Sequence, residues 1–339
     1  MAQSLLRVER IFEYFVCIIF ITYEGENAMR KSLLAAALLS IFALPVTSFA
    51  DEAPATAPAA PAEPAPSWTA TANIGFVSDY YFRGISQSWH KPAVQGGFDV
   101  SHSSGFYAGV WGSNVSPNTY PDASVELDAY AGYNGSTPIE GLGWTAGLYG
   151  YFYPGGSWKK YTYYTAPGIK QTPQGGRWDT YEANFGVSYK WLSAKASVTL
   201  GDWFGAEKKT GWDRGTSGST YIELNAAYPL PWWGLTLIGH VGHLNVAGKL
   251  DVNYQSSSGQ FPSATTERTS PDYTDWKVGL SKGFSIGKSE GWNAGLYYVD
   301  SSNDSYWSDK GYGGSSFNGS TEAKNLSDGR FVVTVGRTF

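Results

Sequence analysis

The stretch Val125-Glu-Leu-Asp-Ala-Tyr-Ala-Gly-Tyr133 alternates between two kinds of side chain. In an extended chain, Val, Leu, two Ala and Tyr share one face, while Glu126, Asp128 and Tyr130 share the other. A strand with two carboxylates on its polar face needs water on that side and can meet an apolar environment on the other. Such a strand is typical of a membrane barrel with a polar lumen.

The same period recurs along the chain, in WTATANIGF at 68–76, YEANFGVSY at 181–189 and LSAKASVTL at 192–200. No long segment with a helical period follows residue 67. Twelve strands are predicted, within a range of 10–14. They are expected near 68–77, 92–102, 106–114, 125–134, 142–152, 181–190, 192–202, 220–228, 235–244, 274–284, 292–300 and 330–339.

The connections between these strands alternate between brief and long, which favours one all-β, antiparallel transmembrane barrel over residues 68–339. Short connections suit periplasmic turns, and long polar ones suit extracellular loops. The alternative is a secreted soluble β-sandwich, whose strands also alternate. The apolar faces here are rich in Ala, Gly and single aromatics, and charges are scattered over the polar faces, so the barrel is favoured.

The C-terminal stretch RFVVTVGRTF places Phe331, Val333, Val335 and Arg337 on alternate positions and ends in Phe339. A terminal aromatic that closes an alternating strand resembles the signal by which barrels are recognised for membrane insertion. We therefore expect the barrel-assembly machinery as a partner, acting on Phe339. Arg337 departs from the apolar pattern and can extend its guanidinium to the interface.

The N-terminus carries an export signal. Met29-Arg-Lys precedes the apolar run SLLAAALLSIFALPV, and Ser48-Phe49-Ala50 supplies small residues around a cleavage site. Residues 29–50 are therefore predicted to be a cleaved signal peptide, with 1–28 an upstream mis-start or a leader extension. Residues 51–67 form an Ala/Pro-rich linker without an apolar face. Export to the outer membrane, with its lipids and lipopolysaccharide as partners, follows from this signal and the barrel together.

Composition and motifs exclude several functions. The formal net charge of −5 and a pI near 5.4 leave no basic surface for nucleic acid. His240 and His243 fall on opposite faces of a strand, so a shared metal is not expected. No G-x-S-x-G motif accompanies the histidines. Neither a cofactor nor an enzyme activity is predicted.

Charged side chains on the polar faces are predicted to line the lumen near its outer mouth. Continued alternation after residue 77 sends Asp79, Tyr81 and Arg83 inward, with Arg83 opposite a group of carboxylates. The remaining lumen candidates are Glu126, Asp128, Glu182, Glu223, Asp275 and Lys277.

This excess of carboxylates predicts a porin-like channel for passive diffusion of small hydrophilic solutes or ions, with a weak cation preference. Two alternatives stay open. One is a non-conducting structural or receptor-like barrel with a plugged lumen, because twelve strands alone do not decide conductance. The other is a lipid-modifying barrel enzyme.

The blocks SDYYFRGISQ at 78–87 and PAVQGGFDVSHSSGFYAGVWGSN at 92–114 resemble the TorF-family porins, a group of proteobacterial outer-membrane proteins. Between the blocks, Trp89-His90-Lys91 stands where smaller polar residues are expected, so the loop contacts differ there. The resemblance implies an outer-membrane pore and names no solute.

Overall fold

The computed structural model describes residues 67–160, 163–166, 169–171, 175–250, 270–302, 306–309, 311–314 and 321–339. The predicted leader, signal peptide and linker therefore lie outside the described residues, apart from Ser67. In the described part of the chain, no helix is long and apolar enough to cross a membrane.

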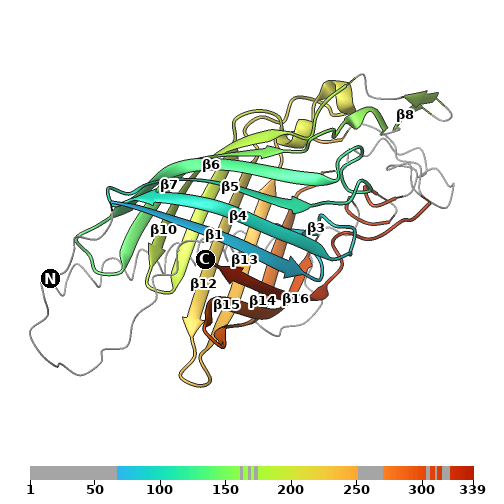
Figure 1. The fold of residues 1–339 in the computed structure, drawn as a ribbon. Helices are drawn as coiled ribbons and strands as arrows, with labels where there is room; N and C mark the ends of the chain where they lie inside the picture. The colour runs from blue at the N-terminus through green and yellow to red at the C-terminus, as the bar shows by residue number, and fades with distance from the viewer. Residues whose placement is uncertain are drawn as a thin grey trace, which may run out of the picture. The chain divides into compact units, whose positions relative to one another are not determined.

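Twelve antiparallel strands close into one barrel, which confirms the predicted fold and strand number (Figure 1). Consecutive barrel strands pair with each other, and the last strand pairs with the first. The strands are β1 (Trp68–Val77), β4 (Ala93–His102), β5 (Phe106–Asn114), β6 (Val125–Ser136), β7 (Leu142–Phe152), β10 (Thr180–Tyr189), β11 (Leu192–Thr199), β12 (Thr220–Pro229), β13 (Leu235–Asn245), β14 (Tyr273–Ile286), β15 (Ser289–Ser301) and β16 (Arg330–Thr338).

Each strand separates an apolar outer face from a more polar inner face. In β6, Val125 and Leu127 are exposed on the outside, while Glu126 and Asp128 are buried inside. Because exposing such an apolar outer belt to water is unfavourable, the arrangement suits a lipid environment. The outward and exposed apolar side chains include Ile74, Phe76, Val94, Phe98, Val110, Leu148, Phe185, Ile222, Leu237, Leu280, Leu296, Phe331 and Val333.

The C-terminal residue completes the seam of the barrel. Phe339 exchanges backbone hydrogen bonds with Ala72, and the register of β1 with β16 runs from Asn73 opposite Thr338 to Val77 opposite Thr334. The Phe339 ring is exposed, with the Arg337 guanidinium 4.3 Å from its centre. An outward aromatic ring at a strand end is what an interfacial girdle requires.

Short and long connections lie at opposite ends of the barrel, as predicted. One end, the short-turn end, carries the turns 103–105, 137–141, 190–191, 230–234 and 287–288. The other, the long-loop end, carries the connections 78–92, 115–124, 153–179, 200–219, 246–272 and 302–329. The long connections contain the small hairpins β2 (Tyr81–Phe82) with β3 (Ile85–Ser86) and β8 (Tyr163–Ala166) with β9 (Ile169–Gln171), together with the 3-10 turns η1 (Trp158–Lys160), η2 (Trp203–Gly205) and η3 (Lys208–Thr210).

Candidate functional site in the barrel lumen

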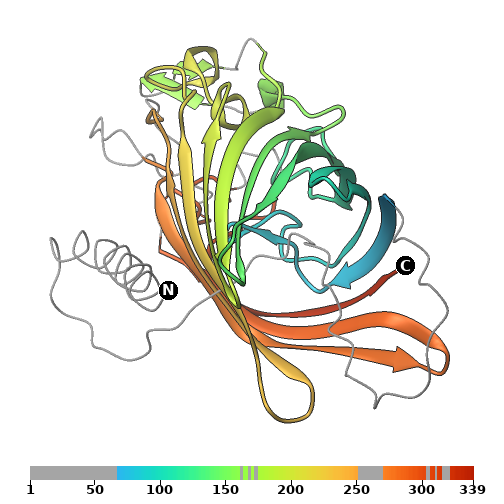
Figure 2. The same cartoon turned by 90° about the vertical axis from the view of Figure 1, so that its left-hand side faces the viewer.

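Residues 78–92, here the inserted segment, fold into the barrel instead of standing above it. The expectation that strand alternation continues to Arg83 is wrong, because β1 ends at Val77 and the chain turns into the β2–β3 hairpin. Ile85, Ser86 and Trp89 are at most 2% exposed. The segment after β1, blue to cyan in Figure 2, lies within the ring of strands. It therefore occupies part of the lumen at the long-loop end.

Internal hydrogen bonds shape the inserted segment around Asp79. The Ser86 hydroxyl donates to Asp79 Oδ1 at 2.7 Å, and His90 Nδ1 lies 2.6 Å from Asp79 Oδ2. His90 Nε2 lies 2.7 Å from the carbonyl oxygen of Asn325, which ties the segment to the last long connection. Asp79 is thus buried inside the segment and bonded to it.

Arg83 crosses from the inserted segment to the opposite wall. Its two terminal nitrogens donate to both Glu182 carboxylate oxygens on β10, at 2.8 and 2.7 Å. Its guanidinium also lies 4.2 Å from the ring centre of Tyr221 on β12. Burial lowers the pKa of Arg83, but Glu182, Tyr151 and Tyr221 together raise it more, so the net shift is upward and the charge persists.

Gly84 lets the backbone approach β14 and β15. Its φ of 75° lies in the left-handed region, and an added Cβ would overlap the side chain of Asp275. The non-glycine residues Arg83, Trp89 and His90 also have φ between 49° and 59°. Such backbone conformations persist only when surrounding contacts impose them. The inserted segment is therefore held in place by the wall it contacts.

A chain of ionisable and polar side chains runs along the β11–β14 wall. Lys195 Nζ lies 2.6 Å from Glu223 Oε1, and His240 Nε2 lies 2.9 Å from Asp275 Oδ1. The Tyr221 hydroxyl donates to Asp275 Oδ2 at 2.9 Å. Each carboxylate on this wall thus has a nearby base or donor, as buried charge requires.

Glu126 and Asp128 on β6 lack a comparable basic partner among the described residues. The Tyr153 hydroxyl donates to Glu126 Oε1 at 2.6 Å. Glu126 Oε2 and Asp128 Oδ1 are buried and have no hydrogen-bond partner in the described part of the chain. Burial, and then the charge of Glu126, raise the pKa of Tyr80, Tyr120 and Tyr153 well above the ordinary value. These loop phenols therefore stay protonated and able to donate.

Tyrosines line the inner face of β5, β6 and β7. Tyr107, Tyr130 and Tyr149 are half-buried, and Tyr151 lies deeper, beside the inserted segment. Tyr130 and Tyr149 are stacked with ring centres 4.9 Å apart. Their position follows from the strand period, since residues two apart on a strand share a face.

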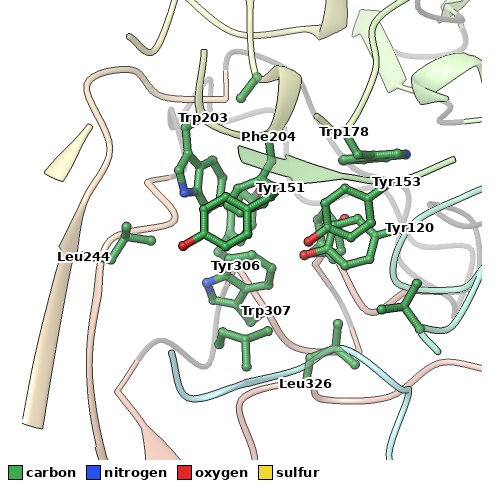
Figure 3. Close-up of a cluster of buried hydrophobic side chains, with 14 of the residues drawn as sticks. Tyr120, Tyr151, Tyr153, Trp178, Trp203, Phe204, Leu244, Tyr306, Trp307 and Leu326 are labelled. Carbon is green, nitrogen blue, oxygen red and sulfur yellow. The ribbon is translucent and has the colours of Figure 1, made fainter. Parts of the chain in front are cut away.

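An aromatic cluster packs over the lumen at the long-loop end (Figure 3). Trp203 and Phe204 from one connection meet Trp307 from another and Tyr151 from β7. A second group stacks Tyr120 on Tyr153 and Trp158 on Trp178, each pair with centres 4.1 Å apart. Rings from several connections thus form one packed core above the barrel wall.

The structure places the predicted lumen residues in distinct settings. Glu182 meets Arg83, and Glu223 and Asp275 join the β11–β14 wall, while Glu126 and Asp128 lie near loop phenols. Lys277 lies 5.4 Å from the ring centre of Tyr297, and the Tyr81 hydroxyl donates to Asp328 O at 3.0 Å.

Sequence reasoning missed His240 and the tyrosines as site residues. Their inward positions in the alternation were the signal that could have found them. His240 is buried on the inner face and His243 is exposed on the outer face. Among the described residues, no group of three or more His, Cys, Asp or Glu side chains could hold a metal ion.

The chain matches a known protein family. The family model described as "Bacterial protein of unknown function (Gcw_chp)" matches residues 61–339. No curated protein matches the chain.

Among solved structures, a KdgM porin in complex with disordered oligogalacturonate is similar at 8% identity and a TM-score of 0.39, covering 80% of this chain and 99% of that chain. The COG4313 outer membrane channel from Pseudomonas putida F1 is similar at 14% identity and a TM-score of 0.37, covering 84% and 100%. Since the family model spans nearly the whole described chain, this protein belongs to the Gcw_chp family of bacterial proteins.

Proposed function

We propose that this protein is a porin-like channel of the outer membrane for small hydrophilic solutes or ions, with the inserted segment as its constriction. The observation that carries the proposal is a closed barrel with an apolar outside and a charged inside, crossed by Arg83. A charged interior suits an aqueous path, because unpaired charge in an apolar interior is costly.

A weak cation preference follows from the distribution of charge. Glu182, Glu223 and Asp275 each lie beside a basic side chain, whereas Glu126 accepts from the Tyr153 phenol and neither Glu126 nor Asp128 has a basic partner among the described residues. When they are ionised, these two carboxyls give the lumen negative charge that no base on β6 balances. A low-dielectric wall focuses this field and favours cations.

A plugged, non-conducting barrel is the second candidate. It is favoured by the burial of the inserted segment and by the aromatic cluster above it. Both candidates share the fold. They differ only in whether the inserted segment leaves an aqueous path through the lumen.

Planar-bilayer conductance of refolded protein tests the proposal. The wild-type chain should give small, stable current steps, and removal of residues 80–90 should enlarge them severalfold. Heat-modifiable migration on a denaturing gel confirms that each variant is folded. If the folded wild type passes no current, the channel is wrong; current that appears only after the deletion then identifies the inserted segment as the plug.

Membership of the TorF porins belongs to the same proposal, supported by the two sequence blocks at 78–87 and 92–114. So do export by a cleaved signal, contact with lipopolysaccharide, and recognition of Phe339 by the barrel-assembly machinery. Fractionation of the full chain tests the location: recovery in the soluble periplasmic fraction would contradict it.

A further inference from the structure

Two tyrosine rings lie flat against the inner wall of the barrel. A Cβ at Gly132 on β6 or Gly147 on β7 would meet the hydroxyl of Tyr107, at 2.5 and 2.6 Å. A Cβ at Gly109 on β5 would likewise meet the ring of Tyr130, at 2.5 Å. Each ring thus extends over glycines of neighbouring strands. Because both tyrosines are only half-buried, they leave surface open to the lumen.

The aromatic surface continues toward the long-loop end. Tyr149 stacks on Tyr130 and lies 6.2 Å from Tyr151, with an interplanar angle of 26°. Phe82 of the inserted segment meets Tyr151 edge-on at 5.5 Å. Tyr107, Tyr130 and Tyr149 are here the tyrosine wall. It ends at Tyr151, which is buried beside Phe82 of the inserted segment.

Polar groups of opposite charge border the tyrosine wall. Asp99 Oδ1 accepts a hydrogen bond from the Tyr130 hydroxyl at 2.5 Å. The Tyr151 hydroxyl lies 3.4 Å from Glu182 Oε2, the oxygen that also binds Arg83. Lys195 with Glu223 lies on the β11–β12 part of the barrel. A solute that stacks on the tyrosines therefore meets both donors and acceptors.

The ion pair between Arg83 and Glu182 favours ligands whose polar groups can bond to both partners. A simple ion entering between Arg83 and Glu182 satisfies one partner and leaves the other unpaired in a buried position, which is costly. A hydroxyl group both donates and accepts, so it can bond to the two partners at once. Adjacent hydroxyls on a ring match the two-pronged guanidinium and carboxylate.

We infer that the lumen binds neutral sugar rings, whose apolar faces lie on the tyrosine wall while their hydroxyls bond to Asp99 and, by displacing the ion pair, to Arg83 and Glu182. This inference rests on the proposed function for the route by which a solute reaches the wall. Flat aromatic surface selects the ring, and the opposed charges select its hydroxyls.

Glucose and sorbitol provide a matched pair of probes, because both have six carbons and several hydroxyls but only glucose has a ring face. Saturation-transfer NMR on the refolded chain in detergent measures their binding without requiring conduction. Glucose binding should reach saturation, and sorbitol should bind at least about threefold more weakly. Equal binding of the two, or no binding of either, overturns the inference. Stronger binding of choline than of glucose assigns the wall to organic cations and also overturns it.

Variants on one strand locate the site. Tyr130→Leu should weaken glucose binding by roughly three- to tenfold, the size of one aromatic contact. Tyr130→Phe keeps the ring and should restore most of the binding. Tyr133→Leu, which alters an outward ring of β6 beside Phe106, should leave binding unchanged. Equal effects of Tyr130→Leu and Tyr133→Leu would contradict a lumen site.

Conductance separates this inference from the proposed function. Current steps that glucose does not interrupt, together with no NMR binding, leave the channel intact and remove the sugar site. Glucose binding without current from any folded variant keeps the sugar site and makes the barrel a receptor.

Discussion

At the scale of single residues, the ion pair between Arg83 and Glu182 holds the inserted segment against β10, across the lumen. Arg83 is 9% exposed and Glu182 3% exposed, so removal of one partner leaves the other charge buried. Loss of one partner of a buried pair is destabilising by about 3–5 kcal/mol. Most of that change falls on the inserted segment, because the barrel strands keep their backbone pairing.

Arg83→Ala is therefore expected to release the inserted segment and raise single-channel conductance, with Arg83→Lys intermediate because it keeps charge without the two-pronged contact. Arg330→Ala is the control. Its partner Asp328 lies 3.7 Å away on an exposed surface, where such a pair contributes at most about 1 kcal/mol. Unchanged conductance in a folded Arg83→Ala variant would show that this pair does not hold the constriction.

At the scale of elements, the β2–β3 hairpin depends on one close approach to the wall. Gly84→Ala adds a Cβ that overlaps Asp275 and also places a side chain at φ 75°. Gly234→Ala adds the same atom at φ 62°, where nothing lies within 4 Å. We expect Gly84→Ala to displace the hairpin and raise conductance, and Gly234→Ala to leave conductance at the wild-type value. A wild-type current from a folded Gly84→Ala variant would show that the close contact with β14 does not position the hairpin.

The aromatic cluster is expected to hold the long connections together. Trp203→Ala removes a buried ring from its contacts with Phe204, Trp212 and Trp307. Such a change typically lowers the free energy of unfolding by about 3–5 kcal/mol. Limited proteolysis of reconstituted protein should then cut the long connections faster. Trp233→Ala, at a turn where the ring is 78% exposed, should not change the cleavage rate. Equal cleavage of both variants would show that the cluster does not order these connections.

At the scale of the whole molecule, the lumen charge predicts selectivity. Reversal potentials across a salt gradient should show a weak cation preference that shrinks as salt rises, since the screening length falls to about 3 Å at 1 M. Glu126→Gln with Asp128→Asn should remove most of the preference, because these are the carboxylates without a basic neighbour in the described structure. Glu207→Gln, on a long connection with Lys209 beside it, is the control. Anion preference in the wild type, or a preference that survives the double change, would contradict the charge argument.

The strand pattern was predictable because it depends on local alternation. The segments 68–77, 106–114 and 142–152 match the observed strands at both ends, and the β6 faces are as predicted. Other strand ends shift by up to three residues: β15 begins at Ser289 instead of 292, and β11 is shorter than predicted. It ends at Thr199 where the alternation continues to 202, because Asp202 instead accepts a hydrogen bond from the Thr216 backbone and a 3-10 turn begins at Trp203.

By itself, the sequence determined the closed barrel, its strand number, its two faces and the alternation of short and long connections. These follow from a period of two, which each strand expresses without reference to the others. Only the tertiary structure decided that residues 78–92 enter the lumen, that Arg83 pairs with Glu182, and that tyrosines of three strands form one surface. Those contacts join distant residues, such as Arg83 and Glu182, which are 99 positions apart, and no local pattern encodes which distant side chains a folded loop will meet.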